Sequence, residues 1–214
     1  MKIARMALVG LGVLVLSVLT THSAQAGTLT FDSLSCSPTG SAIPGGYGGL
    51  NWSNMYCVPA ASNAYNPSGY SNGIGNVAFN GGGGVAFSSS TPFNLSTLEL
   101  GAAWNNGLAV VITGYNGTKQ LYQDTFTVST SGLNLETLNF YGVTLVTFSS
   151  SGGTSEGFAS TGLGPGGVFG TGTEFVLDDM TVPEPSVIVL LGSLLLLLTL
   201  GIPFASRLRA ATTT

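Results

Sequence analysis

The central part of this sequence predicts an all-β fold, a jelly-roll-like two-sheet sandwich, flanked by an N-terminal signal peptide and a C-terminal transmembrane helix. Three observations lead to this prediction. Helical periodicity is absent between the two ends, short runs of Val, Phe, Leu and Thr recur, and turn-forming Gly, Ser and Asn separate these runs. About ten short strands in about 155 residues suit a sandwich of this type.

The first 26 residues have the parts of a secretory signal peptide. Lys2 and Arg5 form a positively charged start, Met6 to Leu19 is apolar, and Ala24-Gln25-Ala26 offers a cleavage site. The apolar run is short for a membrane span, which needs about 20 residues. We therefore expect cleavage after Ala26, which leaves residues 27–182 as one exported domain.

Strands of the first half are expected at residues 28–34, 76–80, 85–88 and 95–104. In the first of these, Leu29 and Phe31 share one face and Thr28, Thr30 and Asp32 share the other. Residues 76–80 and 85–88 flank the glycines 81–84, which suggests a hairpin. These glycines are not followed by a helix pattern, so they do not predict a phosphate-binding loop.

The second half begins with an expected strand at 108–115. Asn116-Gly117 then predicts a tight turn into a strand at 119–128. Further strands are expected at 137–140, 143–148 and 174–182. Residues 149–173 are mostly Gly, Ser and Thr, and we expect a long mobile loop there.

The expected exported domain is strongly acidic. Lys119 is its only base, against eight Asp and Glu residues, which gives a net charge of −7. Such a surface repels phosphate backbones and anionic lipid heads, so we expect no nucleic-acid partner.

The only histidine of the chain, His22, lies in the expected signal peptide. The exported domain therefore has no Ser-His-Asp or Cys-His catalytic arrangement and no histidine-based zinc site. We expect a protein that is not an enzyme. A glycosidase that uses two carboxylates stays open as an alternative, because the domain has several acids.

The two cysteines, Cys36 and Cys57, both lie in the exported domain. Exported proteins meet an oxidising compartment, so a disulfide is expected between them. It would close a loop of about 22 residues and stabilise the fold by roughly 3 kcal/mol. Two free buried thiols are the alternative.

Asp32, Asp178 and Asp179 are candidate ligands of a structural calcium ion. In jelly rolls the first and last strands often lie side by side, and acids at their ends can chelate a hard cation. Calcium needs six to eight oxygen ligands, so carbonyls and water would supply the rest. Alternation along a strand puts Asp178 and Asp179 on opposite faces, so we expect only one of their side chains to contribute. The alternative is that these acids are solvated charges that discourage edge pairing.

Trp104 is the first candidate for a sugar-binding platform, since it lies where a loop is expected and precedes Asn105 and Asn106. Aromatic faces bind the apolar face of a sugar ring, and amides bind its hydroxyls. Other aromatic residues in or near expected loops are Tyr47, Trp52, Tyr65 and Tyr70. Of these, Trp52 lies in a short alternating run and is expected to fill the core.

The C-terminal part, residues 183–214, follows a three-part pattern. Val182-Pro183-Glu184-Pro185-Ser186 is followed by an apolar run, Val187 to Ala205, and then by Arg207 and Arg209. The run is long enough for a transmembrane helix, because about 20 residues at about 1.5 Å each cross about 30 Å of hydrocarbon. The two arginines should remain cytoplasmic.

This tail resembles the PEP-CTERM sorting signal of exported bacterial proteins. The resemblance implies that an exosortase-type enzyme recognises the Pro-Glu-Pro segment and removes the helix. We therefore expect a precursor anchored in the inner membrane and a product at the cell surface or in the extracellular matrix. A plain single-pass anchor is the alternative.

The body resembles a β-sandwich domain that is found in exported bacterial proteins with this tail. The resemblance rests on three segments: Phe31 to Leu34, Ile43 to Asn54, and Phe175 to Val182. We expect a non-catalytic surface or matrix protein that binds exopolysaccharide. The alternatives are a structural or adhesive matrix component without a small ligand, and the two-carboxylate enzyme named above.

Overall fold

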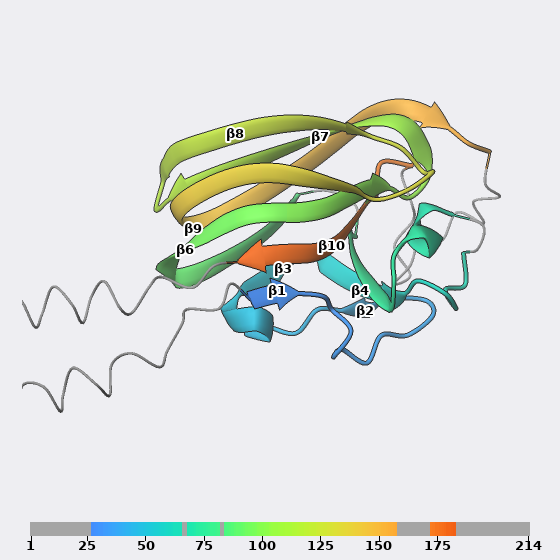
Figure 1. Ribbon diagram of the computed structural model, residues 1–214, viewed down its shortest axis with the longest axis horizontal. Helices are drawn as coiled ribbons and strands as arrows, with labels where there is room; N and C mark the ends of the chain where they lie inside the picture. The colour runs from blue at the N-terminus through green and yellow to red at the C-terminus, as the bar shows by residue number, and fades with distance from the viewer. Residues whose placement is uncertain (1–26, 66–67, 82–83, 158–171, 183–214) are drawn as a thin grey trace, which may run out of the picture. The chain divides into compact units, whose positions relative to one another are not determined.

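The computed structural model describes residues 27–65, 68–81, 84–157 and 172–182. They form one antiparallel sheet of ten strands, which confirms the all-β prediction (Figure 1). The strands are β1 (Gly27–Leu29), β2 (Ser41–Ala42), β3 (Asn51–Ser53), β4 (Met55–Pro59), β5 (Asn76–Asn80), β6 (Val85–Ala102), β7 (Asn105–Asn116), β8 (Lys119–Val128), β9 (Asn134–Ser155) and β10 (Phe175–Val182). Two 3₁₀ helices, η2 (Tyr47–Gly49) and η3 (Gly69–Asn72), lie in connections.

The strands follow the order β2-β4-β5-β10-β6-β9-β7-β8, and β1 and β3 pair with β10 and β6. We call β7, β8 and β9 one half of the sheet and the strands on the other side of β6 the other half. β6 pairs with β9 of the first half and with β3 and β10 of the second. Ser88 near its start lies opposite Asn51 of β3, and Ala102 at its end lies opposite Phe175 of β10. The register between β6 and β9 shifts at three places between Ser88 and Thr97. Such irregularities bend and twist a strand pair. β7, β8 and β9 accordingly lie above β1, β3, β4 and β10 in Figure 1.

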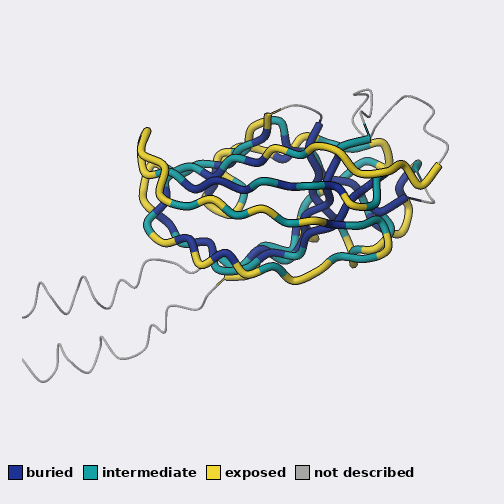
Figure 2. The backbone as a smooth tube through the Cα atoms, turned by 90° about the horizontal axis from the view of Figure 1, so that it is seen from above, coloured by how far each residue is buried: buried dark blue, intermediate teal, exposed yellow. Residues whose placement is uncertain are grey.

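The main core lies between these halves. On β7, Leu108, Val110 and Ile112 are fully buried, while Ala109 and Val111 between them are partly exposed. This alternation puts every second side chain in the core. Figure 2 shows buried and exposed segments alternating along the long strands. A second, smaller cluster includes Val58, Tyr70, Val77, Phe79, Trp104 and Val176.

Two predicted strands, 76–80 and 119–128, have the bounds of β5 and β8. The predicted turn at Asn116-Gly117 is also confirmed, because Asn116 pairs with Lys119 and Gly117 has a positive φ of 59°. The predicted strands 85–88 and 95–104 instead fall in one long strand, β6, which ends at Ala102. The predicted strands 137–140 and 143–148 both belong to β9. Their ladder resumes beyond each register shift, so the turn-like residues between the predicted pieces do not end the strands.

Three other expectations were wrong. The first strand ends at Leu29 instead of residue 34, because Phe31 adopts a left-handed conformation (φ 59°). β5 lies between β4 and β10, so it forms no hairpin with β6. β9 continues to Ser155, so the expected loop at 149–173 begins as strand; residues 158–171 lie outside the described part.

β1 and β10 lie side by side along the whole length of β1. Gly27 is opposite Val182, and Leu29 is opposite Met180. The first and last described residues of the domain therefore meet at one place on the sheet.

Candidate functional site

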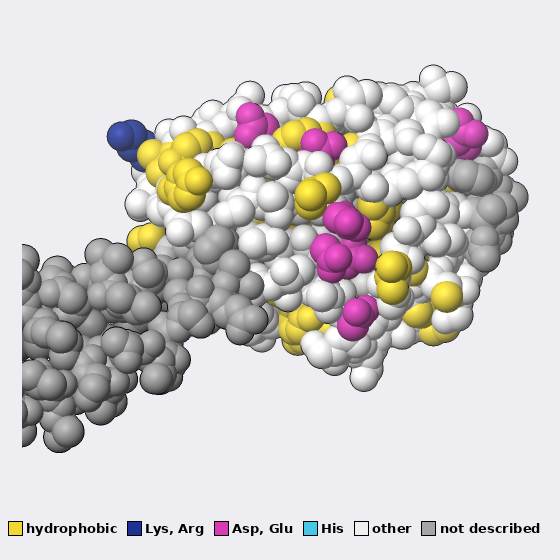
Figure 3. Space-filling model, in the orientation of Figure 1, with side chains coloured by type: hydrophobic (Ala, Val, Ile, Leu, Met, Phe, Trp, Pro, Cys, Tyr) yellow, Lys and Arg dark blue, Asp and Glu magenta, His cyan; other side chains and the backbone are white. Residues whose placement is uncertain are grey.

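Four carboxyl groups gather around the middle of β10. Asp178 lies directly opposite Glu99 of β6, and Asp179 and Asp32 are close enough to affect the pKa of Asp178. The only base among the described residues is Lys119, at the start of β8. Figure 3 shows acidic side chains grouped over the middle of the visible face and the basic side chain at one end. These four residues, called here the acidic cluster, form a negative patch without a neighbouring base.

The electrostatics of the acidic cluster favour proton uptake. Burial is the main reason that the pKa of Asp178 rises from 3.8 to about 7. The negative charges of Asp179, Asp32 and Glu99 add to this rise, while a hydrogen bond from the Asp179 backbone opposes it. Burial and the charge of Asp179 also raise the pKa of Glu99. Near neutral pH, Asp178 therefore exchanges between its charged and neutral forms.

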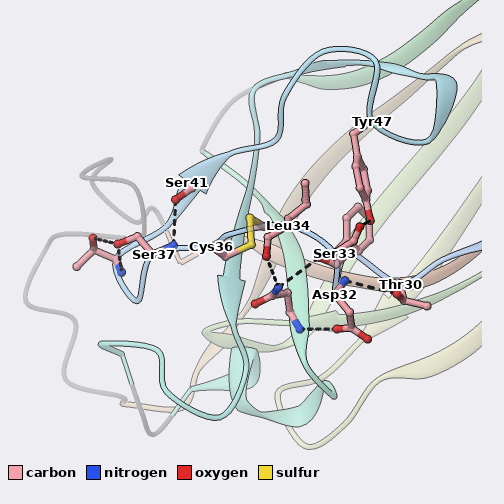
Figure 4. The surroundings of a disulfide bond; sticks show 12 residues. Thr30, Asp32, Ser33, Leu34, Cys36, Ser37, Ser41 and Tyr47 are labelled. Carbon is pink, nitrogen blue, oxygen red and sulfur yellow. Dashed lines mark hydrogen bonds between the residues drawn. A yellow bond between two sulfur atoms is a disulfide. The ribbon is translucent and has the colours of Figure 1, made fainter.

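Asp32 lies in the turn after β1 and is fixed there by the first residue of β5. Its Oδ1 atom accepts a hydrogen bond from the backbone N–H of Asn76 at 2.9 Å. The Asn76 side chain in turn donates to the carbonyls of Leu34 (2.9 Å) and Phe31 (3.3 Å) (Figure 4). Gly75 makes room for this contact, since a Cβ there would lie 1.8 Å from Asp32 Oδ1. Asp32 was predicted on the first strand, whereas it lies in this turn.

Asp178 and Asp179 do not follow the strict alternation that the sequence predicted. Asp179 has a φ of 44°, and the register between β10 and β6 shifts between Asp178 and Thr181. The backbone N–H of Asp179 also donates to Asp178 Oδ1 at 3.0 Å. This irregularity keeps both residues within one cluster. Glu99 was missed as its fourth member, because only the pairing of β6 with β10 brings it there.

The structure brings the predicted calcium ligands near one another, but not into a ready metal site. Among the described residues, no group of three or more His, Cys, Asp or Glu side chains is arranged to hold a metal ion. Calcium would therefore need these side chains to move together and carbonyl or water oxygens to complete its shell. Calcium binding stays a prediction.

Cys36 and Cys57 are joined by a disulfide, with Cα atoms 5.6 Å apart. Cys57 lies on β4 and is buried, while Cys36 lies in the loop between β1 and β2. In this loop the backbone N–H of Ser37 donates to Oγ of Ser41, the first residue of β2, at 3.0 Å (Figure 4). The disulfide attaches the loop to the sheet close to the turn that holds Asp32.

The choice of Trp104 as a sugar platform was wrong, because its ring is covered. Only 6% of the residue is exposed, and the ring packs edge-on against Tyr65 and Tyr70 at centroid distances of 6.2 and 5.7 Å. A platform needs an open aromatic face. Trp52 is half-buried and packs against Phe31 and Phe87, as expected for a core residue.

Most of the sorting segment lies outside the described residues. Val182 ends β10, whereas Pro183, Glu184, Pro185, Ser186, Arg207 and Arg209 belong to the part that the structure does not describe. The signal peptide over residues 1–26 and the transmembrane helix over 187–205 lie there too. Within the described ranges, no helix has the length and apolar character needed to cross a membrane.

Comparison with known proteins gives little more. No protein-family model matches the chain. No curated protein matches it either. Among solved structures it is similar to an arabinose-bound α-L-arabinofuranosidase, MgGH51, with a TM-score of 0.37 and 12% identity over 75% of this chain. The match spans 27% of that enzyme's chain. A likeness of this size carries no argument about the fold or the activity.

Proposed function

We propose that this chain is a non-catalytic protein of the cell surface or extracellular matrix that binds exopolysaccharide. The observation that carries the proposal is the chemistry of its surface. In Figure 3 most of the visible face is neither apolar nor charged. The exceptions are the acidic cluster, a few separate acidic side chains, one basic side chain at the end and some apolar groups. A surface rich in hydroxyl and amide groups suits polyhydroxylated ligands, which need many hydrogen bonds and little charge.

The proposed location comes from the sequence. The tail from Val182 to Arg209 resembles a PEP-CTERM signal, so the partner in processing is an exosortase-type enzyme and the precursor is held in the inner membrane. Mass spectrometry of the mature C-terminus tests this step. Processing at this segment should disappear when the gene for the enzyme is deleted. If the mature protein has the same C-terminus with and without the enzyme, the proposed processing is refuted.

The finer fold proposed for the exported domain is a jelly-roll-like two-sheet sandwich. The split pairing of β6 with β3 and with β10 supports it, because one continuous sheet can enclose a core when its long strands bend. An experimental structure with both halves packed across the main core is the expected result. A flat, open sheet would refute it.

The test of binding is sedimentation of the full-length protein with insoluble exopolysaccharide from its own host. Retention that free polysaccharide competes away supports the proposal. If a folded protein stays in the supernatant, the structural or adhesive alternative is favoured instead.

A second candidate is an enzyme that uses two carboxylates, and one observation favours it. The pKa of Asp178 is raised to about 7 and that of the neighbouring acid Glu99 is raised too, and close carboxyl groups with shifted pKa values are typical of acid–base sites. Release of reducing sugar that is lost in both Asp178→Asn and Glu99→Gln would establish this candidate over the first.

A further inference from the structure

The outward side of β8, β7, β9, β6 and β3 carries rows of uncharged side chains, most of them small. Strand pairing aligns these side chains across the sheet. The rows are Thr127–Ala109–Ser151, Thr125–Val111–Ser149, Gln123–Thr113–Thr147–Ala86–Ser53 and Tyr115–Leu145–Ser88–Asn51. We call this surface the hydroxyl face, since hydroxyl-bearing residues occur in every row.

Burial identifies this side as the outer one. The residues that alternate with it on β7, such as Val110 and Ile112, are fully buried. Thr125 on β8 and Ser149 on β9 are exposed, and Val111 between them is partly exposed. Apart from Thr113, which is 7% exposed, the members of the hydroxyl face are partly or fully exposed, so this side of the sheet faces away from the main core.

No member of the hydroxyl face is charged. The acids of the acidic cluster lie around β10, including Glu99 near the far end of β6, and Asp124 alternates with the outward residues of β8. A soluble surface normally has charges on about a quarter to a third of its residues. The absence of both signs from these four rows disfavours an ionic ligand and suits a neutral one.

The spacing of the hydroxyl face is regular. Outward side chains repeat about every 7 Å along a strand and about 4.8 Å between strands. Ser and Thr hydroxyls can each donate and accept a hydrogen bond, and their short side chains lose little freedom when they bind. The side chains of Ala109, Val111 and Ala86 place apolar groups between them. A sugar chain presents the same mixture of hydroxyls and C–H groups.

We propose that the hydroxyl face holds a neutral polysaccharide chain. This inference rests on the proposed function and names its surface and its ligand class. A single hydrogen bond adds only about 0.5–1.5 kcal/mol, so short oligosaccharides bind weakly. A long polymer engages several rows at once, and its affinity comes from these many contacts.

The test uses the full-length protein in detergent and three insoluble neutral glycans: cellulose, chitin and β-1,3-glucan. Alginate beads serve as the acidic glycan. The variant Thr125→Glu/Ser149→Glu places two charges in the middle of the hydroxyl face. The matched control is Thr137→Glu/Thr91→Glu, which adds two charges at exposed positions outside it. Thermal melting verifies that all three proteins are folded.

We expect the parent protein to bind at least one neutral glycan and not to bind alginate. The charged face variant should bind that glycan at least about tenfold more weakly, because each buried charge must lose its water, whereas the control should stay within about twofold of the parent. If the parent binds but the face variant binds equally well, or if alginate is preferred, the hydroxyl face is the wrong surface and exopolysaccharide binding survives. If the parent binds neither these glycans nor host exopolysaccharide, both proposals fail.

Discussion

Asp178 of β10 and Glu99 of β6 occupy directly opposed positions in the sheet, and no base accompanies them among the described residues. Like charges at opposed positions of neighbouring strands destabilise a sheet. The fold tolerates this pair because Asp178 can take up a proton near neutral pH, where its pKa of about 7 lies. The acidic cluster is thus the part of the domain that is most sensitive to pH.

Stability should fall as the pH rises from about 4 to about 7. The pKa of Asp178 is about 7 in the folded state and 3.8 in its ordinary state, so in this range the folded protein binds a proton that the unfolded chain does not. The free energy of unfolding then decreases with pH. Urea unfolding should give a lower midpoint at pH 8 than at pH 5. In Asp178→Asn the difference should shrink, and an unchanged difference would assign the effect to other groups.

Calcium should raise the melting temperature if the acidic cluster binds it. A divalent cation would neutralise carboxylates that have no base beside them, and the effect should grow with pH as Asp178 ionises. Melting curves at pH 8 with calcium and with chelator measure it, and Asp178→Asn provides the comparison. Equal melting temperatures in the parent protein would end the calcium prediction.

Loss of the Cys36–Cys57 disulfide should lower the free energy of unfolding by about 3 kcal/mol, because the bond joins two residues that are 21 positions apart and so closes a loop. Cys36→Ser/Cys57→Ser should therefore unfold at a lower urea concentration than the parent. Addition of a reductant should lower the midpoint of the parent and leave that of the double variant unchanged. Equal midpoints for the two oxidised proteins would show that β4 holds the loop without the bond.

Trp104→Ala should destabilise the domain by about 3–5 kcal/mol, because it empties the space between Tyr65 and Tyr70. The control is Tyr141→Ala, whose side chain is 56% exposed and whose removal should change stability by less than about 0.5 kcal/mol. Urea unfolding gives both values. If Trp104→Ala changes the free energy of unfolding only slightly, the packing of Trp104 does not stabilise the domain and the prediction is wrong.

Asp124 should protect the edge of the sheet from pairing with other chains. β8 is the last strand in the order, and Asp124 lies opposite the buried Ile112, on the core-facing side of this edge. A charge on the inner side of an edge strand discourages another strand from joining it. Asp124→Val should form oligomers at lower concentration than the parent in sedimentation velocity runs. Thr125→Val, on the opposite side of the same strand, should remain like the parent.

Local sequence patterns located much of the sheet but not its pairing. β5 and β8 were predicted at their observed bounds, because turn-forming residues lie directly beside them: the glycines 81–84 after β5 and Asn116-Gly117 before β8. The hairpin expected between β5 and β6 failed because β5 pairs with β4 and β10. Proximity along the chain favours neighbours in the sheet but does not impose them.

The candidate site shows the same division. The first and last strands do meet, which brings Asp32 toward Asp178 as the sequence suggested. Glu99 and the hydroxyl face could not be found in this way, because they depend on the register between strands that are distant in sequence. Trp104 was misplaced because an aromatic residue at a predicted turn can still be covered by a neighbouring loop.

The pairing of Gly27 with Val182 also has a consequence for engineering. Since the domain begins and ends at adjacent positions, a short peptide could join them, and new ends could be opened at the Asn116-Gly117 turn of the β7–β8 hairpin. Such a circular permutant would carry a fused tag or surface tether at the β7–β8 turn instead of at the β1–β10 pair. The domain could then be attached to a surface at either place without a change in any residue of the acidic cluster or the hydroxyl face.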